Sequence, residues 1–223
     1  MSGMAYPKLL SSADILKTAI RLVEQGNADG LSLRAVASAL GVKAPSLYRY
    51  FPHKEALEVA VAEEVLSAMW AELQSASECP DPDTRFRGTV DAYLRFARER
   101  FALYSLIVQN RIPGAYGSKA GKAVWNLLLE AASGISGQRD DTGAAVAIWS
   151  FLHGYATLEH SGAFGASGPR GGLERGVEAF LVNFCNSSSV SQVQDRASTR
   201  ATGVRRQTQS RARISPIDAG KSQ

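Results

Sequence analysis

The amino-acid sequence predicts an all-α protein with a small N-terminal head of three helices and a larger helical body. Apolar residues recur every three or four positions along several segments, a spacing that gives a helix one apolar face. Clusters of glycine, proline and aspartate separate these segments, and no segment shows the alternation typical of a β-strand. We expect a helix-turn-helix head over residues 1–54, a helical body over residues 55–186 and a basic tail over residues 187–223.

The head is expected to contain three helices. The first covers residues 12–25 and ends at the sequence GNADG. A second helix follows Ser32, whose hydroxyl can accept a free backbone N–H of the first turn. It ends at Gly41, because glycine enters the left-handed conformation at little cost. Pro45 suits the first turn of a third helix, where its missing N–H costs nothing. Four apolar residues share one face of the first helix: Ile15, Ala19, Leu22 and Val23.

The body is expected to begin with a long helix and to continue with shorter ones. The long helix covers residues 53–77, and the sequence CPDPD ends it. Helical spacing returns over residues 86–110, as one helix or two, and stops at RIPGAYG. The loops SGQRDDTG and GAFGASGPRGG separate three further predicted helices, which cover residues 119–135, 142–160 and 173–185.

The segment LSLRAVASALGVKAPSLYRYFPHK, residues 31–54, has the charge pattern and geometry of a DNA-binding unit. It contains no acidic residue and four formal positive charges: Arg34, Lys43, Arg49 and Lys54. In the second of its helices, Leu47 and Phe51 project toward the rest of the head, whereas Pro45 and Arg49 project outward. Outward side chains of such a helix meet base edges and phosphates in the major groove of duplex DNA. We therefore interpret the segment as a helix-turn-helix.

The sequence LSLRAVASALGVKAPSLYRYFPHKEAL is similar to the DNA-binding region of the TetR family of bacterial transcription regulators. The likeness extends from about Ser12 to Leu66. The resemblance implies a homodimer, usually a repressor, that binds a palindromic operator in double-stranded DNA and is released by a small-molecule effector. It also implies a phosphate contact for Lys54, while Tyr50 either contacts DNA or is wholly structural. The predicted DNA-binding residues are Ser32, Arg34, Lys43, Ala44, Pro45, Ser46, Tyr48, Arg49, Tyr50 and Lys54.

In the body, Trp149, His153 and Gly154 form the pattern W-x3-HG within IWSFLHGYATLE. This pattern resembles the WHG-type C-terminal domain of one branch of the TetR family. Relatives use the middle helices for a ligand cavity and the last two for a dimeric four-helix bundle. The apolar and aromatic character of the candidate residues would suit a hydrophobic or aromatic effector, with His153 as a polar contact. Aromatic residues at helical spacing also form ordinary cores, however, and a buried His153 can simply be hydrogen-bonded. The candidate effector-binding residues are Phe96, Phe101, Tyr104, Leu106, Trp125, Leu128, Trp149 and His153.

The net charge of +4 is concentrated at the C-terminal end of the chain. Residues 186–223 hold six arginines and one lysine against two aspartates, which gives +5 and leaves the rest near −1. This tail has few large apolar residues and is predicted to be disordered. The alternative is a basic arm that adds nonspecific phosphate contacts. Comparing the salt dependence of DNA binding before and after truncation at Asn186 would distinguish the two.

Other classes of protein find little support in the sequence. The sequence shows no apolar run that could span a membrane and no secretory signal. Cys79 and Cys185 make no disulfide framework. A cytoplasmic protein is therefore expected. No catalytic constellation, phosphate-binding loop or zinc-ligand spacing is evident, so neither an enzyme nor a cofactor is expected. Two alternatives remain: an all-α enzyme or carrier whose head mediates assembly, and an architectural DNA-binding protein without an effector.

Overall fold

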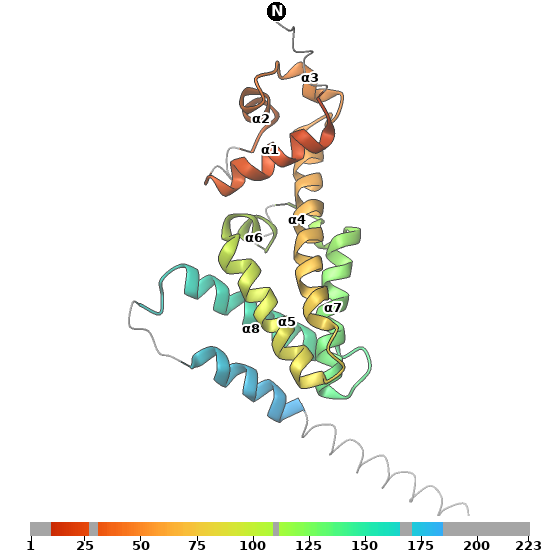
Figure 1. The fold of residues 1–223 in the computed structure, drawn as a ribbon, viewed down its shortest axis with the longest axis vertical. Helices are drawn as coiled ribbons and strands as arrows, with labels where there is room; N and C mark the ends of the chain where they lie inside the picture. Colours follow the sequence, from red (N-terminus) through yellow and green to blue (C-terminus); the bar gives the residue numbers. More distant parts are fainter. Residues whose placement is uncertain (1–9, 27–30, 109–111, 166–170, 185–223) are drawn as a thin grey trace, which may run out of the picture.

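The computed structural model describes residues 10–26, 31–108, 112–165 and 171–184, and every regular element in these ranges is a helix (Figure 1). The prediction of an all-α protein is therefore confirmed. No helix in these ranges is long and apolar enough to cross a bilayer. The elements are α1 (Ser12–Glu24), α2 (Leu33–Ala39), α3 (Pro45–Tyr48), α4 (Lys54–Ser77), α5 (Pro82–Glu99), α6 (Phe101–Val108), the 3₁₀ helix η1 (Ala115–Gly117), α7 (Lys119–Ser136), α8 (Thr142–His160) and a helix over residues 172–184.

The head consists of α1, α2 and α3, whose apolar faces meet in a small core. Serine hydroxyls cap the first two helices: Ser11 accepts the backbone N–H of Asp14 at 3.1 Å, and Ser32 accepts that of Ala35 at 3.2 Å. Gly41, with a φ of +68°, ends α2 as its position predicted. α3 is a single turn. The side chains that hold these helices together are buried: Ile15, Ala19, Val23, Val36, Leu47 and Phe51.

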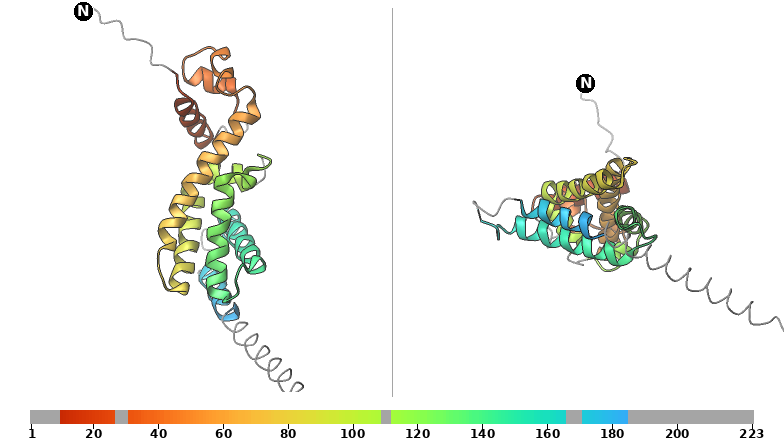
Figure 2. Two further views of the ribbon diagram at one scale, coloured as in Figure 1. Left: turned by 90° about the vertical axis from the view of Figure 1, so that its right-hand side faces the viewer. Right: turned by 90° about the horizontal axis from the view of Figure 1, so that it is seen from below.

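α4 runs from the head into the body, where it lies against α5 and α7 (Figures 1 and 2). Its 24 residues span roughly 36 Å at about 1.5 Å per residue. His53 caps its start, because the ring Nδ1 accepts the backbone N–H of Ala56 at 3.1 Å. One helix therefore connects the head with the interior of the body. Its buried residues are Leu57, Val61, Ala62, Val65, Leu66, Met69 and Leu73.

The region predicted as one helix or two over residues 86–110 contains two helices, α5 and α6, which meet at Arg100. α5 begins four residues earlier than predicted, at Pro82. Proline is tolerated in a first helical turn, and the Asp81 carboxylate caps this one by accepting the backbone N–H of Thr84 at 2.9 Å. The sequence CPDPD thus separates α4 from α5 and also supplies the start of α5.

The last two helices of the described chain lie side by side at the lower end of the body (Figure 2). The rings of Phe151 in α8 and Phe180 in the helix over residues 172–184 meet edge to face, with centroids 5.5 Å apart. Phe180 also meets Phe86 of α5 at 6.5 Å. These aromatic contacts hold the final helix pair against the body.

Candidate DNA interface and effector site

The structure gathers several predicted DNA-binding residues on one side of the head. The start of α2, the end of α3 and the start of α4 border a shallow depression, and four predicted residues line it: Ser32, Arg34, Tyr48 and Lys54. Tyr48 is 52% exposed, so its side chain is accessible at this depression. Lys43 and Pro45 are also exposed, and Ala44 and Ser46 are half-buried. The fold thus leaves a mixed cationic and aromatic surface open to solvent.

Arg49 and Tyr50 form a pair at the end of α3. The Arg49 guanidinium carbon lies 5.3 Å from the centroid of the Tyr50 ring, within range of a cation–π interaction. The Tyr50 hydroxyl donates a hydrogen bond to the backbone carbonyl of Leu10, just before α1. Tyr50 is therefore anchored to the head and orients Arg49, whose side chain is exposed.

Lys54 lies at the N-terminus of α4, where free backbone N–H groups favour an anion. Its ammonium group is 3.1 Å from the Glu58 carboxylate, one turn further along the helix. The Lys54 side chain is half exposed, whereas that of Glu58 is only 18% exposed, so a phosphate can approach the ammonium group from the solvent side. The sequence spacing of Lys54 and Glu58 would have revealed this pair.

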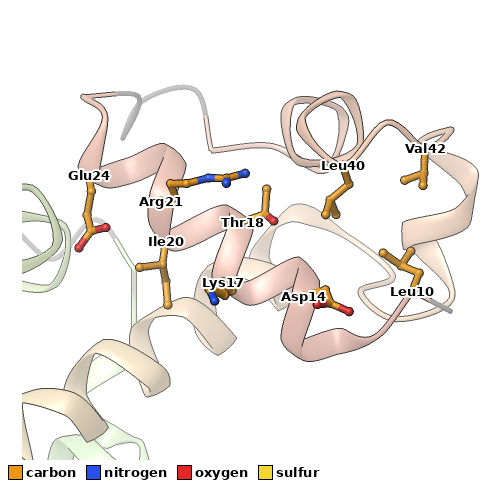
Figure 3. A pocket seen from close by; sticks show the side chains of 9 residues that line it. All are labelled: Leu10, Asp14, Lys17, Thr18, Ile20, Arg21, Glu24, Leu40 and Val42. Carbon is orange, nitrogen blue, oxygen red and sulfur yellow. The ribbon is translucent and has the colours of Figure 1, made fainter. Parts of the chain in front are cut away.

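A second surface feature of the head carries none of the predicted site residues. A groove of about 460 Å³ lies beside α1. Its lining, shown in Figure 3, combines the apolar Leu10, Ile20, Leu40 and Val42 with charged and polar side chains of α1. The charged residues are two acids and two bases: Asp14, Glu24, Lys17 and Arg21. Their charges cancel, so this groove does not favour a polyanion.

The body contains a small cavity between α4, η1, α5, α7 and α8. Its volume is about 20 Å³, enough for one water molecule. Three of the eight predicted effector-binding residues line it: Trp125, Leu128 and Trp149. Sequence reasoning missed the other four lining residues: Met69, Tyr93, Tyr116 and Val124. Tyr93 shares a helix face with Phe86 and Phe96 of α5, so its spacing indicates a buried residue but not a cavity residue.

A chain of hydrogen bonds connects this cavity with two more predicted residues. Trp149 Nε1 donates to the Tyr93 hydroxyl at 3.1 Å, and this hydroxyl lies 3.1 Å from that of Tyr104. The Tyr104 hydroxyl in turn lies 2.9 Å from His153 Nδ1. Four side chains from α5, α6 and α8 are thus joined in one polar network behind an apolar cavity.

The remaining predicted effector residues lie elsewhere. Phe96 and Leu106 are buried in the core and do not line the cavity. Phe101 stacks on the exposed His160, with ring centroids 3.4 Å apart, and borders a separate surface depression. The structure therefore brings together five of the eight candidates, namely Tyr104, Trp125, Leu128, Trp149 and His153.

The polar network is electrically neutral at physiological pH. Burial raises the pKa of Tyr104 to about 12 and that of Tyr93 well above its usual value. Burial also lowers the pKa of His153 from 6.5.

In the described part of the chain, no group of three or more His, Cys, Asp or Glu side chains is placed to hold a metal ion.

The lowered pKa of His153 predicts a loss of stability in acid. Below pH 6.5 the unfolded chain protonates this histidine before the folded protein does, so the free energy of unfolding decreases as pH falls through that value. Above pH 6.5 the contribution of His153 to the free energy of unfolding is constant. We expect His153→Gln to reduce this dependence in urea unfolding measured between pH 7.5 and 5.5. His160→Gln is the matched control. The same dependence of the unfolding free energy on pH in the unsubstituted protein and in both variants would contradict the expectation.

Comparison with known proteins agrees with this arrangement. Residues 15–61 match the family model for bacterial regulatory proteins of the TetR family, and residues 86–180 match the model for the tetracyclin repressor-like C-terminal domain. The class A tetracycline repressor protein from transposon 1721 of Escherichia coli is 33% identical over 161 residues, which cover 71% of this chain and 70% of that protein. An HTH-type transcriptional regulator of Mycobacterium tuberculosis is 26% identical over 166 residues, 73% of this chain and 76% of that one.

Solved structures show the same fold. A protein of Rhodococcus sp. RHA1 superposes with a TM-score of 0.64 at 26% identity, over 82% of this chain and 98% of that one. BioQ, solved with its double-stranded DNA operator, superposes with a TM-score of 0.58 at 18% identity, over 79% of this chain and 99% of that one. The sequence matches, supported by this common fold, establish that the chain belongs to the TetR family of bacterial transcriptional regulators and carries its DNA-binding helix-turn-helix.

Proposed function

We propose that this regulator is a repressor that binds a palindromic operator as a homodimer and is released by a small hydrophobic or aromatic effector. The observation that carries this proposal is the position of two residues on α4. Lys54 begins the helix at the depression on the head, and Met69 lines the aromatic cavity. Fifteen residues at about 1.5 Å each separate them by roughly 22 Å along one rigid element.

α4 is coupled to the cavity by more than Met69. The Glu63 carboxylate of α4 accepts the backbone N–H of Ala120 at the start of α7, at 3.1 Å. α7 supplies Trp125 and Leu128 to the cavity wall. A ligand that separates these walls would therefore shift α4 and the head attached to it. A coupling free energy of about 1–3 kcal/mol between effector binding and DNA binding would change operator affinity about 5- to 150-fold.

The exposed face of α8 supports dimerisation. Val146 is 49% exposed and Leu158 48% exposed, and small residues lie between them on the same face. A Cβ atom built on Gly154 would meet no atom of the described residues within 4 Å, so packing against them does not require a glycine here. The face comprises Val146, Ala147, Ser150, Gly154 and Leu158. Two-fold pairing here would set two recognition helices about 34 Å apart, one turn of DNA.

We expect Val146→Glu to shift the protein toward a monomer, because a carboxylate would be buried without a partner in the dimer interface. Sedimentation velocity at several protein concentrations measures this shift. Val59→Glu is the matched control, since Val59 is also 49% exposed but lies on α4. Equal dimerisation of both variants would place the interface away from α8.

A footprint of the full chain on the DNA around its own gene tests the proposed function. Protection of a short inverted repeat, lost when an effector is added, is the expected result. Uniform coverage would instead favour an architectural DNA-binding protein. A reporter gene placed downstream of the protected repeat would then distinguish repression from activation.

A further inference from the structure

The hydrogen-bond chain behind the cavity has one direction that gives every proton an acceptor. Trp149 Nε1 can only donate, so the Tyr93 oxygen accepts. Tyr93 is 1% exposed, and Tyr104 is the one acceptor that the described residues offer to its proton. Tyr104 then donates to His153 Nδ1, which leaves the imidazole proton on Nε2. The reverse direction would leave the buried Tyr93 proton unpaired, which native structures rarely tolerate.

This direction determines which hydrogen bonds a ligand can make at the cavity wall. Trp149 and Tyr93 both line the cavity, and their polar atoms are hydrogen-bonded to each other. Once separated, Trp149 offers an N–H donor and Tyr93 an oxygen lone pair, because the Tyr93 proton is committed to Tyr104. A ligand that separates these two side chains must accept from Trp149 and donate to Tyr93. A hydroxyl group does both with a single oxygen atom. An ether can only accept, and a hydrocarbon leaves both protein groups unpaired.

The cavity also selects against charge. Its lining contains no acidic or basic side chain. Burial, with a smaller effect from Tyr104, raises the pKa of Tyr116, so this tyrosine is neutral as well. Among the described residues the Tyr116 hydroxyl has no hydrogen-bond partner, which leaves it available to a polar ligand group. A carboxylate or ammonium group would be buried here without a counter-charge, at a large cost.

Three aromatic rings that line the cavity can move apart to admit a planar ligand. Tyr116, Trp125 and Trp149 are half-buried, and the first two meet Trp149 only edge to face, at 5.3 Å and 6.2 Å. An entering aromatic ring can replace these contacts with its own. We infer that the effector is a neutral aromatic molecule carrying a hydroxyl group, whose oxygen inserts between Trp149 Nε1 and Tyr93 Oη. This inference rests on the proposed effector site.

Isothermal titration calorimetry of the full chain with four probes of one skeleton tests the inference. The probes are 4-ethylphenol, 4-ethylanisole, 4-ethyltoluene and the 4-ethylbenzoate anion. We expect the phenol to bind about 5- to 150-fold more tightly than the toluene, the anisole to lie between them and the benzoate to bind most weakly. Equal binding of the phenol and the toluene, tightest binding of the benzoate, or no binding of any probe would overturn the inference.

Tyr93→Phe keeps the ring but removes the hydroxyl that the ligand would contact. In this variant the preference for the phenol over the anisole should disappear, while the hydrocarbon binds at least as tightly as before, because it no longer breaks the hydrogen bond between Trp149 and Tyr93. Tyr155→Phe is the matched control, because Tyr155 lies in α8 but outside the cavity. A thermal unfolding measurement would reveal whether Tyr93→Phe fails to fold. In that case Tyr116→Phe would take its place, and we expect it to lose less phenol binding. An unchanged preference in the folded variant would contradict the inference.

Release of a fluorescent operator duplex, measured separately by anisotropy, distinguishes this inference from the proposed function. Selective binding of the phenol without release of DNA would contradict effector release and leave the ligand class intact. Release of DNA by the hydrocarbon or the benzoate alone would contradict the ligand class and leave effector release intact.

Discussion

Arg49→Ala is expected to weaken operator binding by about 5- to 150-fold at physiological salt, because an arginine that contacts a base contributes about 1–3 kcal/mol. The Arg49 guanidinium is exposed at the end of α3 and rests on the Tyr50 ring. The hydrogen bond from Tyr50 to Leu10 fixes that ring to the head. Anisotropy of a labelled operator duplex measures the change, and sedimentation should show an unchanged oligomeric state.

Arg139→Ala is the matched control for Arg49→Ala. Arg139 lies between α7 and α8, and its side chain is 96% exposed beside Asp140. Both variants lose one positive charge, but only Arg49 faces the proposed DNA surface. If both variants lost the same small amount of affinity, the effect would be one of net charge, and Arg49 would not be a DNA contact.

Gly121→Ala is expected to lower the free energy of unfolding by about 1–3 kcal/mol. A Cβ atom at this position would lie 2.6 Å from the carbonyl oxygen of Ala115 and 2.6 Å from Cα of Tyr116. Both are backbone atoms of η1, which cannot yield by a change of rotamer, so α7 must move away from η1. In a chain of this size each kcal/mol lowers the thermal midpoint by about 2–4 °C, which calorimetry can measure.

Gly134→Ala is the control within the same helix. Its Cβ would lie 3.6 Å from Cβ of Pro82, an ordinary van der Waals distance. Replacing glycine by alanine inside a helix should then stabilise the protein by about 0.5–1 kcal/mol. Opposite signs for the two substitutions are the expected outcome. Stabilisation by both would show that η1 adapts to α7.

Much of the fold could be predicted from helical spacing and helix-capping residues. Ser32, Gly41 and Pro45 mark the turn of the helix-turn-helix where the structure has it. The break between α5 and α6 could not be located, because neither glycine nor proline occurs near Arg100 and tertiary packing decides it. The predicted boundary after residue 54 falls at the first residue of α4, a helix shared by head and body, so that division stays a prediction. The predicted tail lies outside the described residues.

The candidate sites were less predictable than the helices. The spacing of Trp149 and His153 placed them on one helix face, but periodicity does not say which helix lies opposite, so Tyr93 and Tyr116 were missed. Phe96 has the same helical spacing as a cavity residue and yet belongs to the core. The absence of a catalytic motif pointed correctly away from an enzyme, since the chain belongs to a family of DNA-binding regulators. The DNA contacts and effector contacts remain predictions.

The small size of the cavity has a consequence for the proposed response to an effector. A site with room for one water molecule must first adopt a rarer, wider conformation before it can hold an aromatic guest. The apparent dissociation constant then equals the intrinsic one divided by the fraction of molecules already widened. If the proposed effector response holds, substitutions that trim Trp125 would raise that fraction and lower the effector concentration needed, without adding any contact to the guest.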